Sequence, residues 1–192
     1  MKRLALAALA LVALPALAQT STWNVDPSHT HAAFTVRHLV ISNVRGEFGK
    51  TTGTLTLDEG DVTRSKVEAT IDVASVNTRD EKRDGHLKSP DFFDVARYPT
   101  ITFKSTKVEK AGAGALKVTG NLTMKGVTRQ VVLDVAGPSA EVKDPYGNVR
   151  RGLSATTQLD RKDFGVSYGP DAIVSDLVKV QIDAELIKDA SK

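Results

Sequence analysis

Apolar and polar residues alternate along most of the chain, most clearly near the C-terminus. The residues of one parity there are all apolar: Val178, Val180, Ile182, Ala184 and Leu186. Charged or amide residues fill the positions between them. Because successive side chains of a β-strand point to opposite faces, this pattern predicts a sheet with one apolar face and one solvent-exposed face.

Further segments with this alternation are separated by turn residues. The expected strands span residues 22–26, 29–40, 48–58, 66–76, 100–108, 115–123, 127–136, 151–160 and 178–186. The short Met124-Lys125-Gly126 link predicts a hairpin. About eight or nine antiparallel strands favour an all-β fold, a closed or nearly closed barrel, because closure removes exposed sheet edges.

One region, around residues 78–95, departs from the alternation. Thr78 and Glu81 have the spacing of a capping box, which predicts a short surface helix. The adjacent aromatic pair Phe92 and Phe93 follows this helix. We expect a polar helical insertion whose two phenylalanines plug one end of the barrel.

The inward parities are rich in valine, alanine, leucine and glycine, and aromatic residues make up only 5% of the chain. An eight-strand barrel is about wide enough to be filled by side chains or to enclose one slender ligand. Small side chains on the inward faces favour a barrel that encloses a ligand. A barrel filled by its own side chains is the alternative.

The N-terminal residues have the features of a secretory signal peptide. Two basic residues precede an apolar stretch over residues 4–14, and Ala-Leu-Ala at 16–18 is a small-x-small cleavage site. We expect cleavage to remove residues 1–18 and leave a single exported domain, residues 19–192.

Cleavage also changes the charge balance. It removes two of the 26 basic residues and none of the 23 acidic ones, leaving a net charge of +1. A nearly neutral chain has no electrostatic footprint for nucleic acid. No later segment approaches twenty apolar residues, so stable membrane insertion is not expected. The absence of cysteine excludes disulfides, thiolate metal sites and thiol nucleophiles.

Three histidines lie within ten residues. His29 and His31 share a predicted strand face, at a spacing that suits two metal ligands. The alternative is a polar strand face on which His29 bonds the local backbone. His38 shares the parity of Phe34 and Val36, so it is either a hydrogen-bonded core group or a contact for a ligand's polar head.

Catalytic motifs are missing from the sequence. No serine has the context of a nucleophile elbow, and no serine, histidine and acid form a motif-level triad. We therefore expect neither an enzyme nor a resident cofactor or metal. The charged segment that begins at Arg79 predicts either a solvated helix or a barrel mouth that grips a polar head.

A set of short motifs is spread in order over nearly the whole mature chain. These motifs are VDPSHT at 25–30, FTVRHL at 34–39, VRGEF at 44–48, NTRD at 77–80, DGHL at 84–87, DFFDV at 91–95, YPTITF at 98–103, GNLTMKGVT at 120–128 and RKDFG at 161–165. Together they resemble the YceI family of bacterial periplasmic proteins. The resemblance implies an extended, lipocalin-like antiparallel barrel whose tunnel holds one long amphiphile. That ligand is typically a polyisoprenoid, such as a quinone tail or a prenyl phosphate, and in some relatives a fatty acid amide.

The resemblance also implies a non-enzymatic role, often linked to stress responses, and a possible homodimer. His31 departs from the family pattern, which usually has a small polar residue there, and this argues against a shared metal role for His29 and His31. We therefore expect a periplasmic carrier with at most transient membrane contact. The alternatives are an enzyme that acts on the bound lipid, with His38 or an aspartate as general base, and a metal-binding secreted barrel.

Parity selects the candidate site residues. The tunnel-wall candidates are Phe34, Val36, Phe48, Ile71, Phe103, Leu122 and Leu153, with Phe92 and Phe93 at the plug. The weaker candidates for the head-group end are His38, Arg79 and Arg161.

Overall fold

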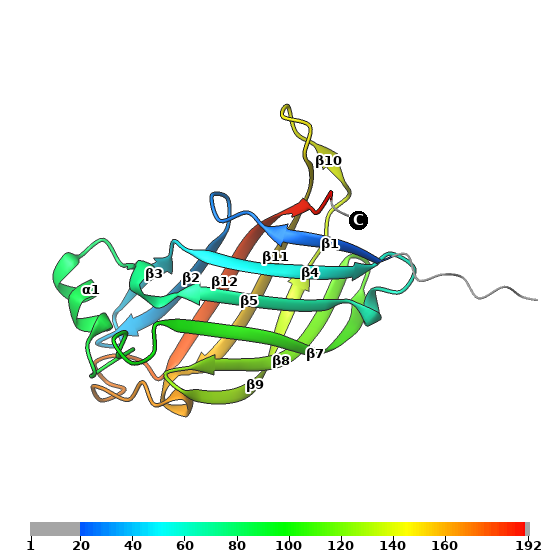
Figure 1. Cartoon of the computed structure of the whole chain (residues 1–192). Helices are drawn as coiled ribbons and strands as arrows, with labels where there is room; N and C mark the ends of the chain where they lie inside the picture. The colour runs from blue at the N-terminus through cyan, green and yellow to red at the C-terminus, as the bar shows by residue number, and fades with distance from the viewer. Residues whose placement is uncertain (1–19, 191–192) are drawn as a thin grey trace, which may run out of the picture.

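The computed structural model describes residues 20–190. Its strands form one antiparallel sheet, and the pairing of β11 with β12 closes eight of them into an elongated barrel (Figure 1). In order around the barrel, these strands are β1 (Thr20–Val25), β4 (Thr51–Asp58), β5 (Lys66–Asp72), β7 (Thr100–Gly112), β8 (Ala115–Met124), β9 (Val127–Ala136), β11 (Val149–Asp160) and β12 (Leu177–Lys188). The predicted eight-strand, all-β barrel is confirmed.

The remaining elements are short and lie mostly at the two ends of the barrel. They are β2 (His31–His38), β3 (Ser42–Phe48), β6 (Val76–Asn77), β10 (Val142–Lys143), the α-helix α1 (Glu81–Lys88), and the 3-10 helices η1 (Val62–Arg64), η2 (Val73–Ser75) and η3 (Arg161–Phe164). Helix α1 lies at one end of the barrel, and the hairpin that contains β10 projects near the other end (Figure 1). None of the helices within residues 20–190 has the length and apolar character needed to cross a membrane. The predicted signal peptide, residues 1–18, lies outside the described residues.

The β2–β3 hairpin extends the barrel wall at the α1 end. Strand β12 pairs with β2 over residues 179–183 and then with β1 over residues 186–188, so β2 continues the edge that β1 begins. The prediction of one strand over 48–58 was wrong, because the chain turns at Gly49 and β3 ends at Phe48. Strand β3 escaped prediction since Gly46 occupies one of its inward positions and carries no apolar side chain.

The helical insertion forms as predicted, but its cap differs. The Asp80 side chain accepts the hydrogen bond from the backbone N–H of Arg83, so Asp80 is the N-cap. Thr78 instead donates its backbone N–H and its hydroxyl to the carboxylate of Asp84. Arg79 has a φ of 64°, which no helix accommodates. The predicted Thr78 capping box was therefore wrong, and the helix begins after these residues.

The predicted hairpin between β8 and β9 is confirmed. Met124 pairs with Val127, and the two residues between them, Lys125 and Gly126, have φ values of 49° and 76°. This is the two-residue turn whose positive φ angles match the twist of the flanking strands, and glycine is favoured there.

A buried arginine holds the long loop over residues 165–176 against the barrel. Arg161 is 6% exposed and also forms an ion pair with Asp176, at 3.0 Å. Its guanidinium donates to the backbone carbonyls of Val166, Tyr168, Gly169, Val174 and Ser175. Every donor of the guanidinium is thus used within the protein, since an arginine side chain has five N–H groups.

Replacing this arginine should destabilise the fold far more than replacing its neighbour. Arg161→Met removes the donor from five buried or partly buried carbonyls and leaves Asp176 without its buried cation, so we expect the free energy of unfolding to fall by roughly 3–5 kcal/mol. Lys162→Met is the matched control, because Lys162 also pairs with Asp176 but is 40% exposed. In urea denaturation, Lys162→Met should lower the free energy of unfolding by less than about 1 kcal/mol. Equal losses for the two variants would contradict the structural role of Arg161.

Candidate functional site

An apolar cavity of about 200 Å³ lies inside the barrel. All eight barrel strands contribute to its lining, together with β2 and β3. No described residue that lines it is charged. The polar lining residues are Thr30, Thr51, Thr54, Ser65 and Thr157. We call this cavity the channel.

Alternation along each strand produces this lining. On β9, Val131, Leu133 and Val135 line the channel, whereas Val132 between them is 44% exposed. The residues of β12 that line the channel have the parity predicted from the sequence: Val180, Ile182, Ala184 and Leu186. The interior is therefore largely apolar, because the inward parity of each strand consists mostly of apolar residues, with a few threonines among them.

The channel is narrow. Its volume lies below the roughly 300–1,000 Å³ that is typical of pockets for compact, drug-sized ligands. Small side chains such as Ala69 and Ala155 occupy positions in the wall. This shape suits a slender chain better than a bulky molecule.

Two glycines create room for aromatic rings in the wall. A Cβ atom on Gly120 would lie 2.4 Å from the ring of Phe103, and one on Gly46 would lie 2.4 Å from the ring of Phe34. Each ring therefore occupies the space that a side chain at the glycine would fill. The glycines allow large apolar residues to line the channel without closing it.

Aromatic rings pack against one another at the α1 end of the channel. The ring of Phe48 contacts Phe34 at a centroid distance of 5.6 Å and Phe93 at 5.8 Å, the latter edge to face. Phe92 instead contacts His86 and Tyr168. Neither Phe92 nor Phe93 lines the channel, so the predicted plug lies in a layer outside the lining.

The structure brings most of the predicted wall residues together. Six of the nine predicted residues line the channel: Phe34, Phe48, Ile71, Phe103, Leu122 and Leu153. Val36 lies further along β2, opposite Val44, and is not part of the lining. The sequence prediction omitted Val118 and Ala155, although the same alternation identifies them.

A wider groove of about 1,130 Å³ adjoins the channel. The two share four lining residues: Ala33, Phe34, Thr157 and Val180. Unlike the channel, the groove has charged walls. Its cationic residues are Arg45, Arg79, Arg83 and Lys179, and its acidic residues are Glu47 and Asp134.

The three predicted head-group residues occupy different places. Arg79 is exposed and lines the groove. His38 ends β2, where it forms a bridge with Val174, and it lines neither the channel nor the groove. Arg161 also lies outside both linings, and its donors hold the 165–176 loop. Of the three, only Arg79 remains a candidate.

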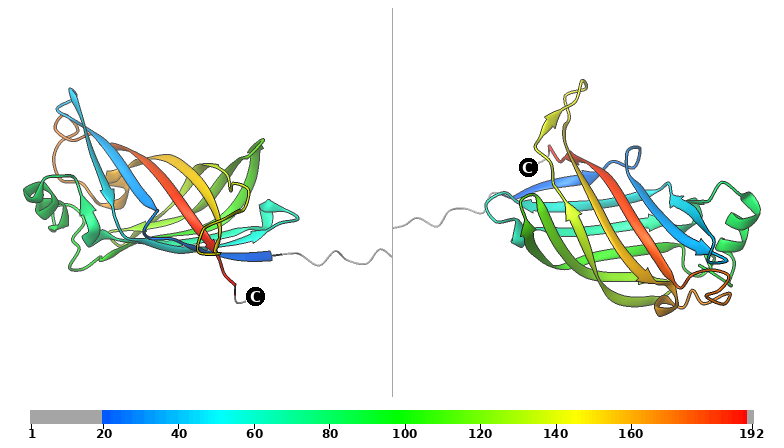
Figure 2. Two further views of the ribbon diagram at one scale, coloured as in Figure 1. Left: turned by 90° about the horizontal axis from the view of Figure 1, so that it is seen from above. Right: turned by 180° about the vertical axis from the view of Figure 1, so that it is seen from behind.

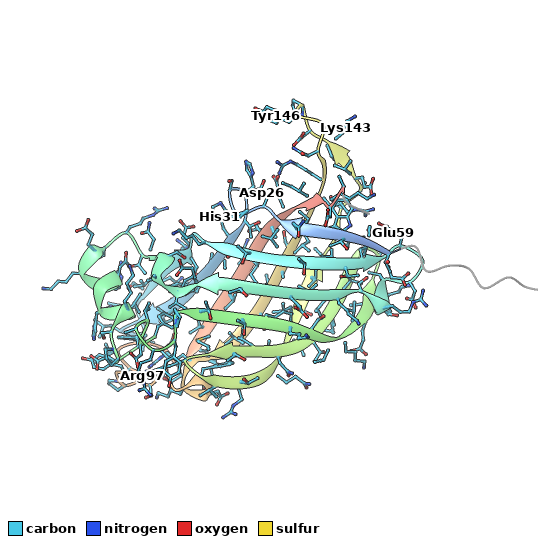
Figure 3. All side chains as sticks on the ribbon, viewed as in Figure 1. Asp26, His31, Glu59, Arg97, Lys143 and Tyr146 are labelled. Atoms are coloured by element: carbon cyan, nitrogen blue, oxygen red, sulfur yellow. The ribbon has the colours of Figure 1, made fainter. Side chains whose placement is uncertain are left out.

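A charged cluster lies at the base of the β10 hairpin, where Figure 3 labels Asp26. His29 Nδ1 lies 2.9 Å from Asp26 Oδ2 and 3.9 Å from Glu185 Oε2. Arg150 Nη1 donates to the carboxylates of Asp26 and Glu185, at 2.6 Å and 3.0 Å, and Arg150 Nε donates to Asp144 at 2.8 Å. Asp26, His29 and Glu185 have ligand atoms within 4.8 Å of one another, close enough for a metal ion, but both carboxylates already accept hydrogen bonds from the Arg150 guanidinium.

The predicted histidine pair is not brought together on one strand. His29 precedes β2 and faces Asp26, whereas His31 begins β2 and lies 3.9 Å from Glu47. The hydrogen bond from Arg150 lowers the pKa of Asp26 well below its usual range, and the hydrogen bond with His29 lowers it further. The cluster therefore acts as an ion-pair network that joins three parts of the chain.

This network should make stability depend on pH. A folded-state pKa below the unfolded value stabilises the fold above the ordinary aspartate pKa of about 3.9, and this contribution is lost as the pH falls. We expect Asp26→Asn to lower the free energy of unfolding at pH 7 and to flatten its decline on acidification. Urea titrations across the acid range measure both effects. An unchanged acid slope in the variant would contradict this assignment.

Comparison with known proteins gives a consistent family. The model of the YceI-like domain matches residues 23–186. A UPF0312 protein of Vibrio cholerae is 36% identical over 159 residues, which cover 82% of this chain and 84% of that protein. The crystal structure of the Campylobacter jejuni YceI protein is 34% identical, with a TM-score of 0.71, and the match covers 80% of this chain and 90% of that one.

A more distant structure shares the fold. It is a polyisoprenoid binding domain from Saccharophagus degradans implicated in plant cell wall breakdown. It is 17% identical, with a TM-score of 0.67, and the match covers 87% of this chain and 98% of that domain. At this identity the likeness concerns the fold alone.

Proposed function

Because the chain belongs to the YceI-like domain family, we propose that it is a periplasmic binding protein for a polyisoprenoid or a similar long-chain amphiphile. The channel holds the apolar chain of one such molecule, for example a quinone or a prenyl phosphate. The observation that carries this proposal is the uncharged, narrow cavity enclosed by all eight barrel strands. The leader predicted at residues 1–18 supports a location outside the cytoplasm.

The energetics favour a long ligand without strong polar contacts. Burial of one methylene group is worth about 0.8 kcal/mol, so about ten buried methylenes supply roughly 8 kcal/mol before the cost of ordering the chain. Because the channel wall has few hydrogen-bonding groups, binding discriminates weakly between apolar chains of similar width. The protein therefore selects by shape and length more than by chemical detail.

The groove suits the polar end of such a molecule. It adjoins the channel at Phe34 and Val180, and Arg79, Arg45 and Lys179 lie on its walls. Cationic side chains beside an apolar tunnel match an amphiphile that has an anionic or hydrogen-bonding head. The fold shared with the polyisoprenoid binding domain of Saccharophagus degradans agrees with this assignment.

Binding is better supported than catalysis on the bound lipid. No described residue that lines the channel has a titratable side chain, so the interior offers no general acid or base. His38, the predicted candidate base, lies outside the lining. The expectation that the protein is not an enzyme stays a prediction.

Identification of a co-purified lipid tests the proposal directly. Solvent extraction of the exported protein, followed by mass spectrometry, should recover an isoprenoid or fatty amphiphile. The protein should also bind an added quinone. A lipid-free protein that fails to bind quinone would contradict the proposal.

A pair of variants on strand β11 tests where the apolar tail of the ligand lies. Ala155 is buried and lines the channel, whereas its neighbour Ser154 is exposed and lines neither the channel nor the groove. Ala155→Leu fills part of the channel, and we expect at least about tenfold weaker quinone binding, or roughly 1.4 kcal/mol. Ser154→Leu is the matched control and should bind as the wild type does. Fluorescence titration measures the quinone affinity of both variants. Equal affinities would contradict the location of the ligand's apolar tail in the channel.

A further inference from the structure

Exposed apolar side chains gather at the α1 end of the barrel. Among the described residues, nine large apolar side chains are exposed, and six belong to the β2–β3 turn, to the loop before β12 or to the first position of β12. These six are Leu39 (48% exposed), Val40 (64%), Ile41 (77%), Tyr168 (48%), Ile173 (44%) and Leu177 (53%). The two views in Figure 2 show this turn and the loop side by side at the same end of the barrel.

The turn and the loop support each other. The backbone N–H of Leu39 donates to the carbonyl of Ile173 at 2.9 Å, and His38 forms a bridge with Val174. The carbonyl of Arg37 accepts from the N–H of Ser175 at 2.9 Å. We call Leu39, Val40, Ile41 and Ile173 the apolar tip. The hydrogen bonds between the turn and the loop hold this projection in place.

The backbone of the tip is strained. Leu39 and Val40 have φ values of 51° and 60°, in the left-handed region that asparagine and glycine favour. For a β-branched residue such as valine this is a genuine outlier. The β8–β9 turn has similar angles but places glycine at Gly126. The chain thus keeps apolar side chains in the β2–β3 turn despite strain that glycine would relieve, which points to a function for them.

The charged residues of the β2–β3 turn and its flanking strand residues are all cationic. Residues 36–45 include Arg37 and Arg45 and no carboxylate. The neighbouring loop has two aspartates that are engaged internally. Asp171 accepts the backbone N–H of Asp176, and Asp176 pairs with Arg161 and Lys162.

We propose that the apolar tip inserts into the surface of a phospholipid bilayer that carries anionic headgroups. Apolar side chains on a projection, beside arginines, match the boundary between acyl chains and headgroups. A second copy of this chain fits less well, because a stable dimer buries about 800 Å² per partner and the tip is a narrow projection. This inference extends the proposed function, since it gives the barrel a place to exchange its lipid.

Vesicle flotation of the exported protein tests the proposal. The vesicles contain either phosphatidylethanolamine with phosphatidylglycerol, or phosphatidylcholine alone. The test variant is Leu39→Asn/Val40→Gly, which removes two apolar side chains and installs residues that suit the turn. Its melting temperature should rise or stay unchanged while its partition onto anionic vesicles falls by at least about tenfold. Loss of binding then cannot be attributed to misfolding.

The matched control removes exposed apolar side chains from the β10 hairpin. Val142 is 63% exposed and Tyr146 is 90% exposed, and the hairpin projects from the barrel apart from α1 (Figure 3). Val142→Asn/Tyr146→Ser should float as the wild type does. Lower flotation for this control than for the tip variant would overturn the proposal.

The remaining outcomes also decide the matter. Stronger flotation of the wild type on the anionic vesicles supports the proposal, whereas no flotation, or equal flotation on both vesicle types, overturns it. If the wild type is a dimer that does not bind vesicles, and the tip variant is a monomer, then the tip is a protein interface and the proposal is overturned. Quinone binding in detergent-free solution, measured in parallel, should be unchanged in the tip variant. If the wild type floats but binds no quinone, the docking surface stands and the proposed cargo fails.

Discussion

The closure of the sheet through the pairing of β11 with β12 determines what the barrel interior can be. Once eight strands form a ring, every residue of one parity faces a space from which water is excluded. Charges cannot enter that space without a partner, because an isolated buried charge is strongly disfavoured. The lining of the channel obeys this constraint along all eight strands. The narrow bore then follows from side-chain size, with glycines placed behind two phenylalanine rings.

The sequence was sufficient for those features that depend on local alternation. The β9 strand forms over the predicted residues, the β8–β9 hairpin forms at Gly126, and most of the predicted wall residues line one cavity. Period-two patterns indicate which face of a strand a side chain occupies, so both the barrel and its lining could be predicted from the sequence. The departures occur where a glycine interrupts the pattern, as at Gly46 in β3.

Features that depend on distant partners were not accessible from the sequence. Arg161 was a head-group candidate, but its donors are used by backbone carbonyls, which have no signature in the sequence. Asp26 meets Arg150 across 124 positions, so their ion pair has no local pattern. Likewise, the Thr78 hydroxyl bonds Asp84 instead of capping α1. In each case a polar group finds the partner that the fold brings near, and spacing along the chain does not reveal it.

The channel and the groove suit different parts of an amphiphile. The channel offers apolar burial, whereas the adjoining groove offers charge beside Phe34. The polar networks around Arg150 and Arg161, which connect distant parts of the chain, lie outside the channel. A binding protein of this design keeps its interior free of polar contacts that would restrict which chain enters.

Methyl-selective NMR of the protein with a bound isoprenoid tests the central claim most directly. Strand β9 provides the comparison, because Val131 and Val135 line the channel whereas Val132 faces outward. The account predicts nuclear Overhauser effects from the isoprenoid chain to the methyl groups of Val131 and Val135, and none to Val132. Contacts confined to Val132 would show that the chain lies outside the barrel and would contradict the account.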